Sequence, residues 1–220
     1  VEPARHRPPT TDNWKQIKAM VRHLTVGDPK LRAIVVLTIA LGMSSFVPVW
    51  TIQIYATEAG LAAGLLGVVW ATANYSVALG SLYSTRVAGR IGLGTLLVVC
   101  IGLVAIGYAG MGLTYTVWGV GFYFVLTIMR GLNGPVLHHE EHRRIPSSDR
   151  AGFVSLRSLI FRGCFLLLGP VVGSSMDRWG QHPVLLAVGA GICAVAIVGL
   201  VMVRRAGVLD EVVLEEAGGS

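Results

Sequence analysis

The chain has 220 residues, of which 53% are apolar and 14% are charged, and its mean hydropathy is +0.65. Soluble domains carry about 25% charged residues, so this chain has too few charges to cover the surface of a soluble fold. The composition argues against a soluble enzyme, a nucleic-acid-binding domain and a disulfide-stabilised secreted domain, although the net charge is +6 and there are 3 cysteines.

Long stretches without any charged residue predict membrane-spanning helices. These charge-free stretches are residues 33–57, 59–85, 91–129, 163–176 and 181–203. A helix needs about 20 residues to cross the hydrocarbon core, so the longest stretch holds two helices and divides at the Gly-rich residues 110–114. The predicted spans are residues 31–55, 61–85, 93–111 and 115–136, a fifth that begins after Arg150 and ends at Met176, and residues 183–203. We therefore expect an all-α membrane protein of six transmembrane helices, with a cytoplasmic linker at 1–30, the bundle at 31–205 and a cytoplasmic tail at 206–220.

The basic residues predict the orientation of the spans. The N-terminal segment, counted through Arg32, carries seven Lys and Arg residues and another seven follow the second, fourth and sixth spans, whereas Arg178 alone lies on the other side. Because Lys and Arg accumulate in cytoplasmic loops, we expect both termini in the cytoplasm and the protein in the inner (cell) membrane. Residues 14–24 predict an amphipathic helix, lying either on the membrane surface or on neighbouring protein. The acidic end of the tail is expected to be solvated.

Three segments, together with the six spans, carry a resemblance to a known family. They are the basic amphipathic residues 14–29, the sequence RGLNGP at 130–135 with IPSSDRAGFVSLRS at 145–158, and GSSMDRWG at 173–180, which fits G-x-x-x-D-R-x-G. The chain resembles the C-terminal half of a major facilitator superfamily transporter, including part of the central linker.

The resemblance implies one bundle with a three-plus-three inverted repeat. It also implies alternating-access transport of a drug-like or metabolite molecule, as in ion-coupled efflux or antiport. The partners are then the bilayer, the substrate and an N-terminal six-helix half, with no nucleic acid and no cofactor. The resemblance further suggests gating residues in two loops, Arg86 and Arg90 in one and Asp177 and Arg178 in the other. The loop GSLYSTRVAGR at 80–90 departs from the family by lacking its acidic residue.

Polar and aromatic side chains within the spans are candidates for lining a substrate cavity. Asn74 lies near the middle of the second span, and Trp70 shares its helical face. Substrate sites of secondary transporters lie near the bilayer midplane, but an amide there also makes hydrogen bonds between helices. Trp50 and Gln53, at the outer end of the first span, either anchor the helix at the interface or form part of an outer gate.

Arg162 is the fifth candidate. A 20-residue span that ends at Met176 begins at Arg157, which places Arg162 about 7–8 Å inside the cytoplasmic boundary. There it either snorkels or pairs with another helix, or binds an anionic substrate or a carboxylate of the other half. Arg157 and Arg130 are expected to be shallower. No Asp or Glu is expected deep in a span, so a carboxylate for proton coupling would belong to the missing half.

Other motifs are interpreted structurally. The sequence HHEEH at 138–142 matches an H-x-x-E-H zinc-protease pattern, but its place in a short basic loop indicates a solvated segment without metal. The pairs Gly60/Gly64 and Gly169/Gly173 predict close helix packing.

Two other classes of protein remain as alternatives. An intramembrane protease needs a buried Ser–His pair, yet His182 lies at a span edge and no G-x-S-x-G sequence occurs, so no enzyme is expected. The other alternative is a stand-alone six-span protein that acts as a homodimer or as a non-transporting subunit.

Overall fold

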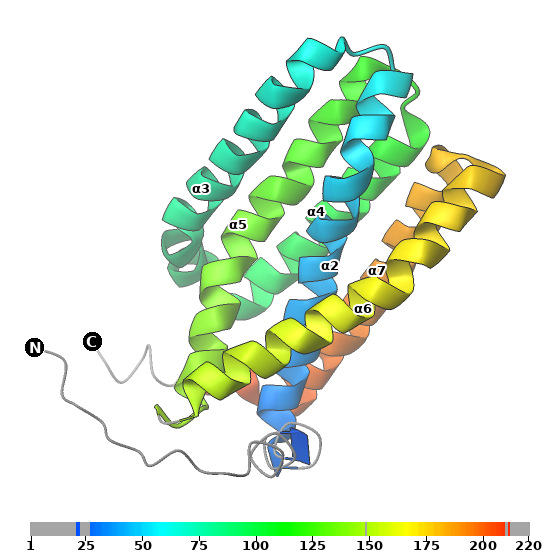
Figure 1. The fold of residues 1–220 in the computed structure, drawn as a ribbon. Helices are drawn as coiled ribbons and strands as arrows, with labels where there is room; N and C mark the ends of the chain where they lie inside the picture. The colour runs from blue at the N-terminus through cyan, green and yellow to red at the C-terminus, as the bar shows by residue number, and fades with distance from the viewer. Residues whose placement is uncertain (1–20, 23–26, 148, 210, 212–220) are drawn as a thin grey trace, which may run out of the picture.

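The computed structural model describes residues 21–22, 27–147, 149–209 and 211. Six long antiparallel helices form a bundle (Figure 1), namely α2 (Pro29–Glu58), α3 (Leu66–Ile91), α4 (Leu93–Leu113), α5 (Val120–Arg143), α6 (Arg150–Trp179) and α7 (Gln181–Arg205). Short 3-10 turns, η2 (Ala63–Leu65) and η3 (Val117–Gly119), precede α3 and α5. The described chain contains no strand, and six of its helices are long and apolar enough to cross a membrane. The prediction of an all-α, multi-pass membrane protein is confirmed.

The helices extend well beyond the charge-free stretches. Arg86 and Arg90 lie within α3 rather than in a loop, and Asp177 and Arg178 lie in the last turn of α6. The division of the longest stretch is confirmed, because α4 ends at Leu113. Arginine is a good helix former, so a helix does not end where the hydrocarbon ends.

Single glycines end two of these helices. Gly92 alone separates α3 from α4, and Gly180 alone separates α6 from α7. Their φ angles are +76° and +82°, in the left-handed region that favours glycine. The two loops predicted there are therefore one-residue joints.

The core surrounds α2, which packs against α5 and α7. In contrast, α6 buries only Phe153, Leu156 and Val172, and it makes light contacts with α2 and α7. The helix α3 packs closely along α5, while α6 crosses α2 obliquely (Figure 1). The start of α2 and the end of α7 lie at one end of the bundle, here called the basic end because Lys and Arg gather there. Which side of the membrane it faces stays a prediction.

Residues 1–20 and most of the tail lie outside the described residues, including nearly all of the predicted amphipathic helix at 14–24. The first residues of the tail are described, and they differ from the solvated end that the sequence predicts. Val208 is fully buried in the main core, and Glu211 forms ion pairs with Lys30 and Arg144.

Glycines bring the backbones of α3 and α5 into contact where these two helices cross. A Cβ atom on Gly131 would lie 2.4 Å from the carbonyl oxygen of Val77 and 2.9 Å from the Cα atom of Gly80. The glycine pairs predicted from the sequence, Gly60/Gly64 and Gly169/Gly173, do not bring two helices together in this way. Gly60, Gly64 and Gly173 have no atom within 4 Å of an added Cβ. Spacing alone is misleading because close packing needs a facing helix, and these glycines face none in the described chain.

Candidate ligand cavity

A cavity of about 460 Å³ lies between α2, α3, α5 and α6. Its lining residues are Thr38, Ile39, Gly42, Phe46, Val77, Ser81, Arg130, Gly131, Asn133, Gly134, Pro135, His138, Arg157, Ser158 and Phe161. On each helix these residues lie from about the middle of the helix toward the basic end. The volume falls in the range of about 300–1,000 Å³ that is typical of small-molecule sites.

Arg130 is one of two arginines that line this cavity. It is the eleventh residue of the 24-residue helix α5, about 15 Å from the start and about 20 Å from the end. The helix α5 continues to Arg143 instead of ending near Val136, and the depth of Arg130 in a membrane stays a prediction. Within the described part of the chain, Arg130 makes no hydrogen bond or ion pair. Arg130 is exposed, so its guanidinium is an unpaired charge at the cavity wall within the described chain.

A buried ion pair borders the cavity toward the basic end. The Nη1 atom of Arg157 donates to Oε2 of Glu141 at 2.5 Å, and Glu141 is fully buried. The second carboxylate oxygen, Oε1, is buried without a hydrogen-bond partner. Glu141 lies in the last turn of α5, so the prediction that no acid lies deep in a span is not contradicted by its burial. The polar composition of the HHEEH segment, to which Glu141 belongs, gives no sign of this burial.

The HHEEH segment forms the last turns of α5 rather than a solvated loop. Both of its glutamates are buried, Glu140 pairing with Arg144 at 2.6 Å and Glu141 with Arg157. Burial is tolerated because each carboxylate has an arginine partner. Among the described residues, no three His, Cys, Asp or Glu side chains are grouped as metal ligands.

Aromatic rings form the apolar part of the cavity wall. Phe46 meets Phe161 edge to face with 5.2 Å between ring centroids, and it meets Phe165 in the same way at 4.6 Å. Trp50 stacks on Phe165 at 5.9 Å and is 61% exposed. Trp50 thus extends this aromatic cluster away from the cavity instead of lining it.

The remaining predicted cavity residues lie elsewhere. Asn74 is exposed, and its amide donates to the carbonyl of Trp70 in the same helix at 2.9 Å. Gln53 and Arg162 are exposed and do not line this cavity. Whether these residues face a cavity completed by a second bundle stays a prediction.

Asn133 is a lining residue that the sequence reasoning missed. It is buried, and its amide donates to the carbonyl of Met129 at 2.7 Å. It belongs to the RGLNGP sequence at 130–135, which carries the resemblance to a family and also contains Arg130. The polar side chains of that sequence, an arginine and an amide three residues apart within an apolar helix, are the signal that could have identified both lining residues.

The predicted gating residues lie at the ends of helices. Arg86 is exposed, with its guanidinium 5.9 Å from the centroid of the Tyr83 ring. Arg90, Asp177 and Arg178 are exposed or half-buried beside the two glycine joints. Their role in gating stays a prediction.

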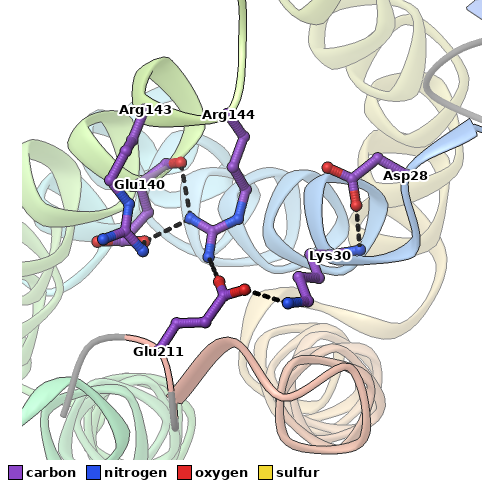
Figure 2. A network of polar contacts seen from close by, with 6 residues as sticks. All are labelled: Asp28, Lys30, Glu140, Arg143, Arg144 and Glu211. Atoms are coloured by element: carbon purple, nitrogen blue, oxygen red, sulfur yellow. Dashed lines mark hydrogen bonds and ion pairs between the residues drawn. The ribbon is translucent and has the colours of Figure 1, made fainter. Parts of the chain in front are cut away.

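An ion-pair network joins three parts of the basic end (Figure 2). Glu211, after α7, pairs with Lys30 at the start of α2 and with Arg144 after α5, the latter at 2.8 Å. Arg144 also reaches Glu140, and the side chain of Asp28 accepts from the backbone N–H of Lys30. The hydrogen bond from Lys30 is the main cause that lowers the pKa of Glu211, and Arg144 adds to it. These contacts fasten the same end of α2, α5 and α7.

No family model, curated protein or solved structure matches the chain. The resemblance to the major facilitator superfamily therefore enters below as a proposal.

Proposed function

We propose that this chain is one six-helix half of a secondary transporter of the major facilitator type. In this proposal it moves a small molecule by alternating access, and an N-terminal six-helix half supplies the other wall of the site. The observation that carries the proposal is Arg130, an exposed arginine near the middle of helix α5 that has no ion pair in the described chain and lines a ligand-sized cavity. An arginine at the bilayer centre costs about 2.5–3.5 kcal/mol on the insertion scale, so such residues mark solute pathways.

Internal similarity supports a repeat of three plus three helices. The residues LTI-x-x-G occur at 37–42 in α2 and again at 126–131 in α5. The sequence R-x-G closes both α3 and α6, at residues 90–92 and 178–180, and in each the glycine N–H donates to a carbonyl four residues back at 2.8 Å. Inverted repeats of this kind are common in secondary transporters.

Helix packing follows the same repeat, with one exception. The helix α4 packs on α5 as α7 packs on α2, yet α3 packs closely on α5 whereas α6 barely touches α2. The difference lies at the matched glycines. Gly131 contacts the backbone of α3. Gly42 instead contacts the ring of Phe161 from α6, and a Cβ added to Gly42 would lie 2.8 Å from the Cε2 atom of Phe161. The space left between α2 and α6 forms part of the cavity, and a rocking of α6 would change it.

Cysteine accessibility tests this proposal. In the native gene product with Cys100, Cys164 and Cys193 replaced by alanine, Ser81→Cys introduces a thiol that lines the cavity. We expect a charged thiol reagent that cannot cross the membrane to label it both in right-side-out and in inside-out vesicles, because alternating access exposes the cavity to each side in turn. Labelling from one side only would instead favour the stand-alone, non-transporting six-span protein.

Ser76→Cys is the matched control, since Ser76 lies on the same helix but off the cavity, with its hydroxyl bonded to the carbonyl of Thr72. We expect little labelling of this variant from either side. The gene gives an independent check, because the proposal expects the reading frame upstream of the Val1 codon to encode six further apolar spans. Ion-coupled antiport, efflux and the inner-membrane location stay part of the proposal.

A further inference from the structure

We propose that the cavity binds a small organic anion with an apolar or aromatic body, its negative charge held by Arg130. The inference deepens the proposed function, on which it rests, by naming the substrate class of the same cavity. It depends on the charge of the residues that line the cavity, on the apolar side chains among them, and on the ion pair between the second lining arginine, Arg157, and Glu141.

The charge of the lining is positive. Two arginines, Arg130 and Arg157, and one histidine, His138, line the cavity, and no carboxylate of the described chain does. Arg157 already has a counter-charge in Glu141, whereas Arg130 has none in the described chain. A bound anion supplies the counter-charge that Arg130 lacks, and an ionised guanidinium can hold a carboxylate through two hydrogen bonds.

The internal repeat indicates that the fold does not require this charge. In the matched LTI-x-x-G segments, the position of Arg130 in α5 corresponds to Leu41 in α2, which is fully buried in the core. One copy of the repeat thus packs with an apolar side chain where the other presents a guanidinium to the cavity. The difference favours a ligand-binding role for Arg130 over a structural one.

The remaining lining favours an organic anion over a bare inorganic one. Apolar walls come from Ile39, Phe46, Val77, Pro135 and Phe161, and neutral hydrogen-bonding groups come from Thr38, Ser81 and Ser158. A small inorganic anion would leave the apolar walls in contact with water, whereas a ligand with an aromatic body covers them. Sites with mostly apolar walls and a few polar groups are typical of organic ligands.

Glu141 limits the charge that the ligand meets. Its carboxylate neutralises Arg157, so Arg130 provides most of the attraction. Glu141→Gln removes that neutralisation and frees a second guanidinium at the cavity. We therefore expect this variant to bind anions more tightly than the native protein.

Three isosteric probes test the charge preference, namely 2-naphthoate, 2-naphthamide and 2-naphthylmethylammonium. Their binding to the detergent-purified native gene product is followed by fluorescence titration at pH 7. We expect naphthoate to bind about tenfold more tightly than naphthamide, because its carboxylate adds an opposite charge to the hydrogen bonds from the guanidinium whereas the amide carbonyl is neutral, and the cation to bind most weakly. We expect Arg130→Gln to abolish this preference while it leaves the naphthamide affinity unchanged, and Arg130→Lys to retain part of it.

Arg162→Gln is the matched control, because Arg162 is exposed as Arg130 is, but it does not line the cavity. We expect it to leave all three affinities unchanged. Equal affinities for the three probes would overturn the inference. So would equal effects of Arg130→Gln and Arg162→Gln on the preference for naphthoate. A carboxylate of the other half that is already paired with Arg130 would also overturn it. Circular dichroism shows whether each variant folds, and the lysine variant provides the test if the glutamine variant does not.

The Ser81→Cys labelling separates the two proposals. Labelling from both sides without a naphthoate preference refutes the anion and leaves alternating access standing. A naphthoate preference with labelling from one side gives an anion site in a protein that does not transport.

Discussion

Adding one methyl group at Gly131 tests whether the α3–α5 crossing holds these two helices as close as the structure places them. The added Cβ would lie 2.4 Å from the Val77 carbonyl oxygen and 2.9 Å from the Gly80 Cα atom. Both are backbone atoms, so no side chain can rotate to make room. Ordinary van der Waals contact begins at 3.4 Å, so the helices must separate by about 1 Å.

The expected cost is that of overpacking a tight interface, about 1–3 kcal/mol. Alanine also has a higher helix propensity than glycine, by up to about 1 kcal/mol, and this gain partly hides the clash. Gly134→Ala, in the same helix, carries the same gain with nothing within 4 Å of the added Cβ. The difference in unfolding free energy between the two variants therefore isolates the clash.

Unfolding of each variant by sodium dodecyl sulfate in mixed micelles, followed by circular dichroism, measures this difference. We expect Gly131→Ala to be less stable than Gly134→Ala by about 1–3 kcal/mol. Two variants of equal stability would refute the close approach of α3 and α5, and with it the position of the cavity wall formed by Val77 and Ser81.

Three further predictions concern the cavity wall and the basic end. Ion pairs lower the pKa of Glu211 below its ordinary 4.5. The stabilisation that they provide is therefore complete above about pH 4.5 and is lost as the pH falls through the lowered pKa. Melting curves from pH 3 to 7 should show this loss of stability in the native protein and not in Glu211→Gln. Phe161→Ala should lower the unfolding free energy by about 2 kcal/mol in the same assay, which is less than the loss of a fully buried ring costs. Leu159→Ala is the control, and it should change the unfolding free energy by close to zero because Leu159 is 66% exposed. Arg144→Gln removes the shorter of the two ion pairs of buried Glu140, which keeps Arg143 at 3.2 Å, and should cost about 2 kcal/mol, whereas the exposed Arg205→Gln should be neutral.

The six spans could be predicted because hydropathy is summed over about 20 residues, so local errors cancel. Helix ends could not be predicted in this way. A charge-free stretch shows where lipid begins, but α3 continues to Ile91 and α5 to Arg143, through residues that tolerate the helix because their charges are paired or exposed.

The cavity could not be predicted from the sequence because it depends on which helices are neighbours. Asn74 is a candidate for its depth along its own helix, but the side of α3 that faces α5 carries Val77 and Ser81 instead. The segment around Glu141 is polar and predicts solvent exposure, and only the position of α6 shows that Arg157 comes from sixteen residues away to neutralise it. Depth is a property of one helix, whereas burial requires a neighbour.

The two arginines of the cavity belong to different helices, and this couples its charge to its shape. Arg130 is carried by α5, which α3 and α2 hold firmly, while Arg157 is carried by α6, which few contacts hold. The Arg157–Glu141 pair ties α6 to α5 near the basic end, so a rocking of α6 would turn about that pair and move the rest of the helix most. Such a motion would change the volume beside Phe161 while the charge at Arg130 stays in place. A ligand bound at Arg130 would therefore contact a charge that stays in place and a wall, formed by α6, that moves. Only a ligand that fills the space against α6 would bind with different affinity to the protein in the two positions of that helix.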